Sequence, residues 1–248
     1  MDRLVYVAMS GAQQLLEQQA VTAHNLANAS TTGYKAESSA FRVAPLVGPG
    51  MPTRAYALDT TIGADLSAGA VQPTGRDLDI AVEGEGFLTV QGRDGTEAYT
   101  RDGGLSVSPE GELTTRSGLT VLGDGGPINI PPDSKVAIAR DGTVSVTTLG
   151  QSAANVTVLG KLKLVKPERN EVVKGPDGLF RTKTGQPADA DPAVSVVAGA
   201  LESSNVNAVS AMVDMINLAR QFEMHMKLLQ NAESNEQRAT QILSTTAG

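Results

Sequence analysis

The sequence predicts an α+β protein, in which a central, mainly antiparallel β-domain is flanked by long N- and C-terminal helices. Two observations support this class. Apolar residues recur at steps of three and four at both ends of the chain, which is the period of an amphipathic helix. Between the ends, short runs of alternating apolar and polar residues are separated by turn signals such as Asp-Gly, which is typical of antiparallel hairpins.

The first predicted helix covers residues 4–28 and carries mostly small or polar residues on one face. Ala8, Gly11 and Ala12 lie on this face, so a second helix with larger side chains can approach it closely. The helix is expected to end near Ala29, because a run of Ser, Thr and Gly residues follows it up to Gly33.

The next segment, residues 34–75, is rich in Gly, Pro, Ser and Thr and predicts an extended arm with short strands. Residues 76–190 form the predicted β-domain, with a hairpin turn expected at Asp141-Gly142, among others. Residues 191–205 form a return arm. The layout is therefore helix, arm, β-domain, arm and helix.

One run in the β-domain, residues 156–165, alternates without interruption. This pattern predicts a single strand with one buried face and with Lys161 and Lys163 on the outer face.

The second predicted helix covers residues 206–230 and begins the C-terminal segment, residues 206–248. Ser203, Ser204 or Asn205 can cap its start, and the polar residues from Asn231 onward are expected to follow its end. Its apolar residues form one narrow stripe: Val206, Val209, Met212, Val213, Ile216, Ala219, Phe222, Met226 and Leu229. Because so narrow a stripe is stabilised mainly by packing, we expect this helix to pack against the first.

Composition excludes several classes of function. The formal net charge is -7 without a Lys/Arg-rich block, so nucleic acid is not an expected partner. The chain has no Cys, which excludes a disulfide framework and a Cys-based zinc site. The first residues lack the pattern of a cleaved signal peptide, and no stretch has the length of a transmembrane helix.

No catalytic, cofactor or metal site is expected. His24 and His225 are the only histidines, and each lies in a predicted helix without a recognised ligand spacing, so surface or packing roles are expected. Residues 84–86 read as a turn and not as a dinucleotide loop. Asp77 and Asp79 fit strand alternation better than acid–base pairing.

Four segments in the same order resemble the bacterial flagellar rod and hook proteins. They are NLANASTTGYKAE (residues 25–37), TGRDLDIAVEGEGFLTV (residues 74–90), AYTRDGGLSVSPEGEL (residues 98–113) and GALESSNVNAVSAMVDMINLARQFEMHMKLLQ (residues 199–230). The match covers nearly the whole chain. By resemblance, the β-domain forms an outer layer, and the terminal helices pair as a coiled-coil assembly module in an inner layer.

The resemblance also implies a function. The chain is expected to be a structural subunit of the proximal rod that polymerises with itself and with axial proteins similar to FlgB, FlgC and the distal rod protein FlgG. Export through the flagellar type III apparatus without signal cleavage is implied as well. The assembly residues expected from the N-terminal motif are Asn25, Leu26, Asn28, Thr31, Gly33, Tyr34 and Lys35; those from the C-terminal seam are Val209, Met212, Ile216, Ala219, Phe222, Met226 and Leu229.

Two alternatives stay open at this point. One is a distal rod subunit, and the other is a secreted β-domain that binds cell wall or carbohydrate and is closed by its own helices. Separately, the N-terminal motif has a local alternative, in which its residues do no more than end the first helix.

Overall fold

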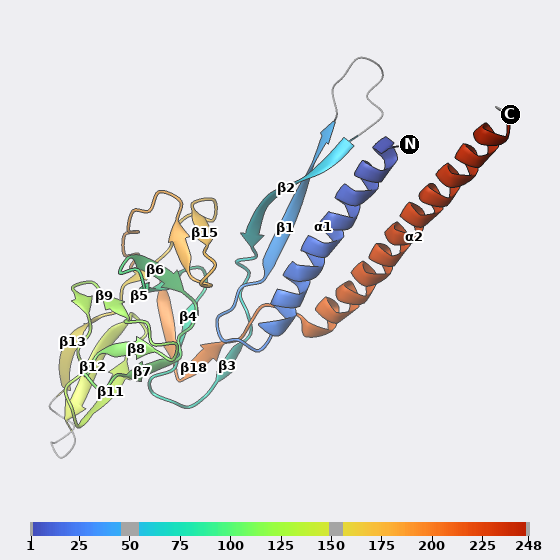
Figure 1. Cartoon of the computed structure of the whole chain (residues 1–248). Helices are drawn as coiled ribbons and strands as arrows, with labels where there is room; N and C mark the ends of the chain where they lie inside the picture. Colours follow the sequence, from blue (N-terminus) through green and yellow to red (C-terminus); the bar gives the residue numbers. More distant parts are fainter. Residues whose placement is uncertain (1, 46–54, 149–155, 247–248) are drawn as a thin grey trace. The chain divides into compact units, whose positions relative to one another are not determined.

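The computed structural model describes residues 2–45, 55–148 and 156–246 (Figure 1). The chain divides into two compact units. Unit 1 comprises residues 1–27, 37–63 and 207–248, and unit 2 comprises residues 28–36 and 64–206. Both ends of the chain therefore belong to unit 1.

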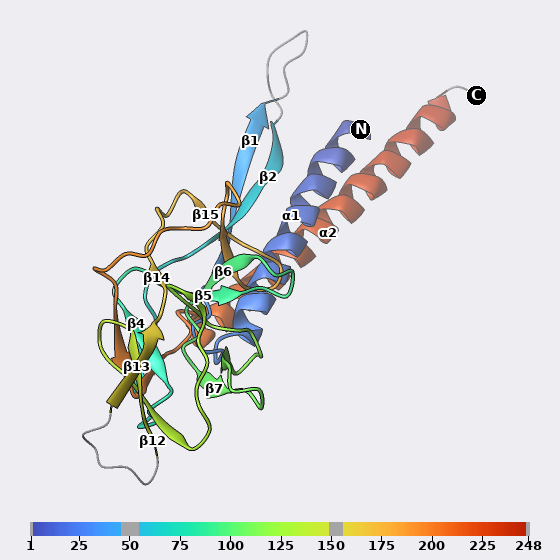
Figure 2. The same ribbon diagram turned by 90° about the vertical axis from the view of Figure 1, so that its left-hand side faces the viewer.

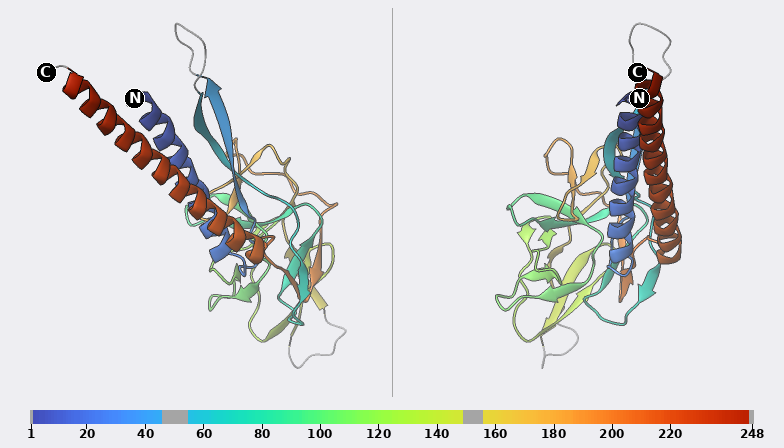
Figure 3. Two further views of the ribbon diagram at one scale, coloured as in Figure 1. Left: turned by 90° about the vertical axis from the view of Figure 1, so that its right-hand side faces the viewer. Right: turned by 45° about the vertical axis from the view of Figure 1, so that its right-hand side comes forward.

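Unit 1 contains two long helices and a two-stranded sheet. Its elements are α1 (Asp2–Ala27), β1 (Glu37–Pro45), β2 (Ala55–Ala64) and α2 (Ala208–Thr246). The helices lie side by side and run in opposite directions (Figures 1 and 3). The β1–β2 pair lies within the segment expected to be an extended arm, part of which, residues 46–54, lies outside the described residues.

Helix α1 packs through the small-residue face that the sequence predicts. Ala12 and Leu15 are buried, and a Cβ atom added at Gly11 would lie 3.1 Å from Cε1 of His225. Because glycine leaves space there, the imidazole ring of α2 can lie directly against the α1 backbone. Of the two roles expected for His225, at the surface or in packing, the structure shows packing.

Both predicted ends of α2 are wrong. Asn207 caps the helix, because its Oδ1 accepts a hydrogen bond of 3.1 Å from the Ser210 backbone amide. The expected caps Ser203, Ser204 and Asn205 lie before the helix. The helix continues past Gln230 to Thr246, since its polar second half contains no Gly or Pro and is built from residues that tolerate a helix.

The expectation that the terminal helices pair as a coiled-coil assembly module is also wrong. Among the described residues the chain is mostly β-structure, with one helix near each end, and only the broad α+β class holds. The expected seam is not the contact between the helices: Val209, Met212, Ile216 and Met226 are exposed, whereas Ala211 is buried. The apolar period correctly indicates a helix, but it does not determine which face meets the partner helix.

Unit 2 is built from short strands. In chain order they are β3 (Val71–Pro73), β4 (Ile80–Glu83), β5 (Phe87–Gln91), β6 (Glu97–Thr100), β7 (Leu105–Val107), β8 (Leu113–Thr115), β9 (Leu122–Gly123), β10 (Gly126–Pro127), β11 (Ser134–Ile138), β12 (Thr143–Thr148), β13 (Val156–Lys161), β14 (Leu164–Val165), β15 (Val172–Lys174), β16 (Phe180–Thr182), β17 (Ser195–Ala198) and β18 (Ala200–Glu202).

These strands form several small antiparallel sheets. The largest has five strands in the order β14-β5-β6-β16-β15, and a second has three in the order β11-β12-β13. Figure 2 labels β5, β6, β14 and β15 of the first sheet and β12 and β13 of the second. Two-stranded sheets join β17 to β4, β18 to β3, β7 to β8 and β10 to β9. Because the strands are divided among several small sheets, the unit is held together by side chains that pack between the sheets.

The hairpin predicted at Asp141-Gly142 is confirmed. It joins β11 to β12, and Gly142 has a φ of 86°, a conformation that a side chain disfavours. Asp141 supports the turn because its Oδ1 accepts a hydrogen bond of 3.1 Å from the Thr143 backbone amide.

The single strand predicted over residues 156–165 is wrong. The run divides into β13, which pairs with β12, and β14, which pairs with β5 in the five-stranded sheet. Lys163 is not on an open face, because its Nζ donates hydrogen bonds of 2.8 and 2.9 Å to the Glu97 carboxylate. Alternation within one run does not reveal that the chain passes from one sheet to another.

The core of unit 2 is mainly aliphatic. Residues with no measurable exposure include Ile80, Leu88, Leu105, Leu113 and Val144. A smaller cluster contains the aromatic residues Phe87, Tyr99 and Phe180 together with Val165. The unit thus has the Val, Ile and Leu core that the low aromatic content leads one to expect.

Two strand pairs bring distant parts of the chain together in unit 2. The β4–β17 pair sets Val82 opposite Val196, and the β3–β18 pair sets Val71 opposite Glu202. The beginning and the end of the β-rich segment therefore lie side by side, which positions the site described below.

Candidate functional site

An apolar stripe on α2 faces away from α1. It consists of Val209, Met212, Val213 and Ile216, whose exposed fractions lie between 51% and 72%. At 100° per residue these four side chains share one side of the helix, opposite the side that carries Ala211 and His225. We call these four residues the exposed α2 stripe.

The rest of the expected seam is less exposed or less continuous. Ala219, Phe222 and Leu229 are half-buried, and Met226 is exposed but lies to one side of the stripe. Beyond Ile216 the line of the stripe is occupied by charged residues, namely Arg220, Glu223 and Lys227. The apolar surface of α2 is therefore concentrated in its first third.

Helix α1 adds two exposed apolar residues that the sequence reasoning did not select. Met9 and Leu16 are both at least half exposed, and their spacing of seven residues places them on one face of the helix. That spacing is a signal in the sequence.

The N-terminal motif begins with a pairing between a side chain and a strand. Asn25 Nδ2 donates to the Glu37 carbonyl, and Asn25 Oδ1 accepts from the Glu37 amide, both at 2.8 Å. The Asn25 side chain thus pairs with the start of β1 as a neighbouring strand would. Leu26 beside it is half-buried, and His24 Nδ1 lies 3.1 Å from a Glu37 carboxylate oxygen.

Asn28 and Thr31 form a local turn in unit 2. The Thr31 amide donates to the Asn28 carbonyl, and Thr31 Oγ1 donates to Asn28 Oδ1, both at 3.1 Å. The turn lets the chain reverse after α1 and leads it into Gly33 and Tyr34, which are both buried. The Lys174 ammonium group lies 3.9 Å from the centre of the Tyr34 ring, within cation–π distance.

The end of this motif carries a buried cluster of charges. Lys35, Arg101 and Glu202 are each at most 3% exposed, and we call them the Glu202 cluster. Lys35 Nζ lies 2.6 Å from one Glu202 carboxylate oxygen, and Arg101 Nη1 lies 2.9 Å from the other. Burial lowers the pKa of Lys35, because the charged ammonium group loses hydration that its carboxylate partner only partly replaces.

Asn205, next to this cluster, was expected only as a helix cap. Its Oδ1 accepts a hydrogen bond of 2.7 Å from the Ala36 amide, and its Nδ2 donates to the Asp65 and Ser67 carbonyls. It therefore joins the chain that follows α1 to the chain that precedes α2, inside unit 2. Neither Arg101, Glu202 nor Asn205 carries a local sequence signal, because their partners are remote in the chain.

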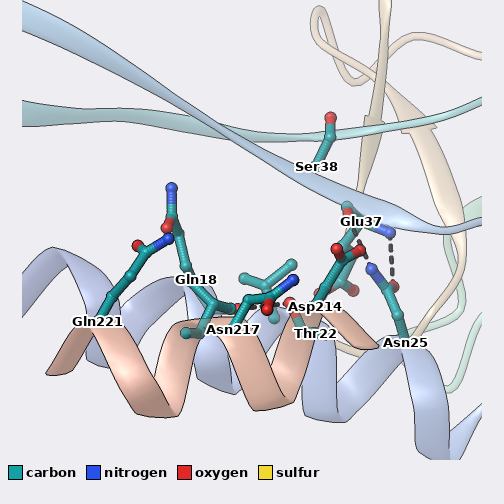
Figure 4. A pocket seen from close by; sticks show the side chains of 10 residues that line it. Gln18, Thr22, Asn25, Glu37, Ser38, Asp214, Asn217 and Gln221 are labelled. Carbon is teal, nitrogen blue, oxygen red and sulfur yellow. Dashed lines mark hydrogen bonds between the residues drawn. The ribbon is translucent and has the colours of Figure 1, made fainter. Parts of the chain in front are cut away.

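Unit 1 contains a polar groove of about 480 Å³ between its helices and β1 (Figure 4). Its lining is Gln18, Val21, Thr22, Asn25, Glu37, Ser38, Asp214, Asn217, Leu218 and Gln221. The lining contains amide, hydroxyl and carboxylate groups and neither aromatic rings nor basic side chains. It therefore lacks the aromatic platform on which a sugar or a base stacks.

The described residues show no cluster suited to binding a metal ion. No group of three or more His, Cys, Asp or Glu side chains converges within them. Asp79 is fully buried and binds Arg116 at 3.1 Å, which makes it part of a structural ion pair. None of the helices in the described ranges combines the length and apolar character needed to cross a membrane.

Comparison with known families agrees with this organisation. Three family models match: the "flagella basal body rod protein" model at residues 5–35, the "flagellar hook protein FlgE/F/G D1 domain" at residues 81–146, and the "flagellar basal body rod FlgEFG protein C-terminal" model at residues 197–242. The matched ranges include most of α1, much of unit 2 and most of α2.

Whole-length relatives agree as well. The chain is 47% identical to the flagellar basal-body rod protein FlgF of Salmonella typhimurium strain LT2, over 98% of this chain and 99% of that protein. It is 34% identical to FlgF of Caulobacter vibrioides, over 93% and 94%. The rod protein FlgG of Buchnera aphidicola subsp. Schizaphis graminum is 31% identical, over 90% and 92%.

The chain therefore belongs to the family of flagellar basal-body rod proteins, and its relatives are structural proteins of that assembly. Within the family it is FlgF-like, because similarity to FlgF extends at 47% identity over the entire chain.

Proposed function

We propose that this chain is a structural subunit of the proximal rod, which polymerises with copies of itself and with other axial proteins to form the torque-transmitting shaft of the flagellum. The observation that carries the proposal is the exposed α2 stripe, which lies inside the matched family region at residues 197–242. The free energy falls when another subunit covers these four apolar side chains and removes them from water. A subunit that offers different surfaces above and below itself makes heterologous contacts, which generate an open helical polymer.

The remaining expectations follow from this role. Other axial proteins similar to FlgB, FlgC and FlgG are the proposed neighbours, and the flagellar type III apparatus is the proposed export route, without a cleaved signal peptide. The proposed location is the periplasmic part of the basal body. The subunit acts through contacts and without catalysis or a cofactor.

The assembly residues of the N-terminal motif take a supporting role in this proposal. Asn25, Asn28, Thr31 and Gly33 set the path of the chain after α1, whereas Tyr34 and Lys35 fasten that path inside unit 2. In the C-terminal seam, Val209, Met212 and Ile216 are the proposed contacts with neighbouring subunits. Ala219, Phe222, Met226 and Leu229 lie off this stripe, and they are proposed to contact neighbouring subunits on other sides of α2.

The alternative of a secreted carbohydrate-binding domain gains no support from the described residues. Such sites usually present an aromatic side chain to the sugar ring. The polar groove has none, and only 3% of the chain is aromatic.

The test is complementation of a strain that lacks this protein. Ile216→Asp should abolish rod completion and motility, because covering an unpaired carboxylate in an apolar contact costs several kcal/mol. Ser210→Asp is the matched control: it adds the same charge to an exposed residue of the same helix, but on a different side. Normal rods in the Ile216→Asp strain, or equal failure of both variants, would overturn the proposed surface.

A further inference from the structure

One carboxylate in unit 2 receives hydrogen bonds from widely separated parts of the chain. Glu202 Oε1 accepts from Lys35 Nζ at 2.6 Å and from the Gly69 amide at 2.8 Å. Glu202 Oε2 accepts from Arg101 Nη1 at 2.9 Å. Lys35 and Glu202 are separated by 167 positions in the sequence, so this contact joins the part of the chain that precedes the β-rich segment to its end.

The two cations extend the network to the surrounding backbone. Lys35 Nζ also donates to the Ser67 carbonyl at 2.7 Å. Arg101 donates to the Val82 carbonyl at 3.1 Å and to the Gly84 carbonyl at 2.6 Å. The two cations thus connect Glu202 to the loop at Ser67 and to the end of β4 at Val82 and Gly84.

Backbone contacts around the cluster connect the same segments. The Gly33 amide donates to the Glu202 carbonyl at 2.8 Å, and the Asn205 amide donates to the Tyr34 carbonyl at 3.3 Å. The Asn205 side chain adds its bonds to Ala36 and Ser67. Residues 33–36 and residues 202–205 are therefore fastened to each other and to the same buried group.

The cluster contains two cations and one anion. Asp65 lies close enough to act on Lys35 electrostatically, but it is exposed and does not pair directly with the ammonium group. Losing the carboxylate leaves two buried cations together, whereas losing Lys35 leaves a balanced Arg101–Glu202 pair. Uncompensated buried charge is far more costly than a missing pair.

We propose that Glu202 is a positioning residue, which closes unit 2 by holding the segment after α1 and the segment before α2 as a pair. When residues 33–36 and 202–205 are held together in this way, the points at which both segments leave unit 2 are fixed. The contact forms only when both segments are in place. The consequence for assembly rests on the proposed function: a rod subunit in which these two segments separate offers a less well-defined unit 2 to its neighbours.

Hydrogen–deuterium exchange on the full-length protein tests this proposal. The variants are Glu202→Gln, Lys35→Met and the double variant, and Glu85→Gln is the matched control, because Glu85 pairs with Arg169 and Lys166 at the surface. In Glu202→Gln, the amides of Gly33, Ala36 and Asn205 should exchange at least about a hundredfold faster, whereas those of the core residues Leu113 and Val121 should not.

The charge count predicts the order of the variants. Glu202→Gln should open the segments most and Lys35→Met least. The double variant should exchange at least about tenfold more slowly than Glu202→Gln alone, because it leaves one buried cation in place of two. A role through hydrogen bonds alone predicts the reverse, since the double variant loses more of them. Lys35→Met also keeps the test informative if Glu202→Gln does not fold.

Three results would overturn the proposal: no acceleration in Glu202→Gln, equal acceleration throughout unit 2, or a double variant that opens more than Glu202→Gln. Rod complementation separates this outcome from a failure of the proposed function. Ile216→Asp should show normal exchange at residues 33–36 while failing to assemble, whereas Glu202→Gln should fail in both measurements. If Glu202→Gln opens these segments and still assembles, the proposed link between closure and assembly is wrong.

Discussion

Two regions of this protein reverse the usual distribution of side chains in opposite ways. The first third of α2 exposes Val209, Met212, Val213 and Ile216 to solvent, whereas unit 2 buries Lys35, Arg101 and Glu202. An exposed apolar stripe contributes little to the stability of the isolated chain, and its free energy becomes available only when another molecule covers it. A buried charge cluster contributes only when its geometry is complete, so it favours one arrangement of the segments that meet there.

The two regions act at different stages: one in the folding of a single chain and the other in assembly between chains. The Glu202 cluster concerns the conformation of a single chain, and its partners all lie within unit 2. The exposed α2 stripe concerns what happens between chains. Changes at the cluster should therefore be visible in the free protein, and changes at the stripe should be visible only on assembly.

The largest effect on the free protein is expected at Gly33, beside the cluster. Its φ is 66°, and an added Cβ atom would lie 2.3 Å from the backbone carbon of Arg101. Gly33→Ala should destabilise unit 2 by about 3 kcal/mol or more, because backbone atoms cannot move aside as a flexible side chain can. Chemical denaturation monitored by circular dichroism measures the loss.

Gly75→Ala is the control for backbone conformation alone. Gly75 has a similar φ of 72°, and no atom lies within 4 Å of an added Cβ. It should cost about 1 kcal/mol. Equal losses at the two glycines would show that the close approach to Arg101 is not tight in solution.

A smaller effect is expected from the packing of unit 1, where neighbouring leucines on α1 differ in burial. Leu15 is 8% exposed and Leu16 is 50% exposed. Leu15→Ala should destabilise unit 1 by about 2–3 kcal/mol, because it removes buried methyl groups and leaves a cavity. Leu16→Ala should change stability by less than about 0.5 kcal/mol. Thermal unfolding followed by helix ellipticity distinguishes the two variants. A reversed order would mean that Leu16, and not Leu15, is on the buried face of α1.

The smallest effect is expected at Tyr99, a buried polar group that carries no charge at neutral pH. Burial raises its pKa from 10.0 to about 12, and its hydroxyl donates to Glu97 at 3.0 Å and accepts from the Ala188 amide at 2.7 Å. Since the unfolded chain loses this proton first, the folded state holds more protons between these two pH values. Stability should therefore fall as pH rises from 10 toward about 12.

Denaturation of wild type and Tyr99→Phe across that pH range checks this prediction. The variant lacks the titrating group, so its stability should fall less steeply. A parallel fall in both proteins would mean that Tyr99 titrates normally and that its hydroxyl is accessible to water.

Sequence reasoning was most successful where a structure depends on near neighbours. The period of α1, its end at Ala27, two residues before the predicted Ala29, and the turn at Asp141-Gly142 follow from local preferences. A helix needs regular spacing, and a tight turn needs a residue that accepts positive φ. It was less successful where a pattern fits two outcomes. Residues 156–165 alternate regardless of whether one sheet or two receive them, and polar residues such as those after Gln230 permit a helix as well as a tail.

By itself, the sequence determined that each end of this chain forms a helix, that short antiparallel strands lie between them, and that the whole belongs to the flagellar rod proteins. The tertiary structure alone decided which face of α2 meets α1 and which side chains meet Glu202. The physical reason is distance along the chain. Helices and turns are selected by residues a few positions apart, whereas Lys35, Arg101 and Glu202 recognise one another only after folding has brought them within hydrogen-bond reach.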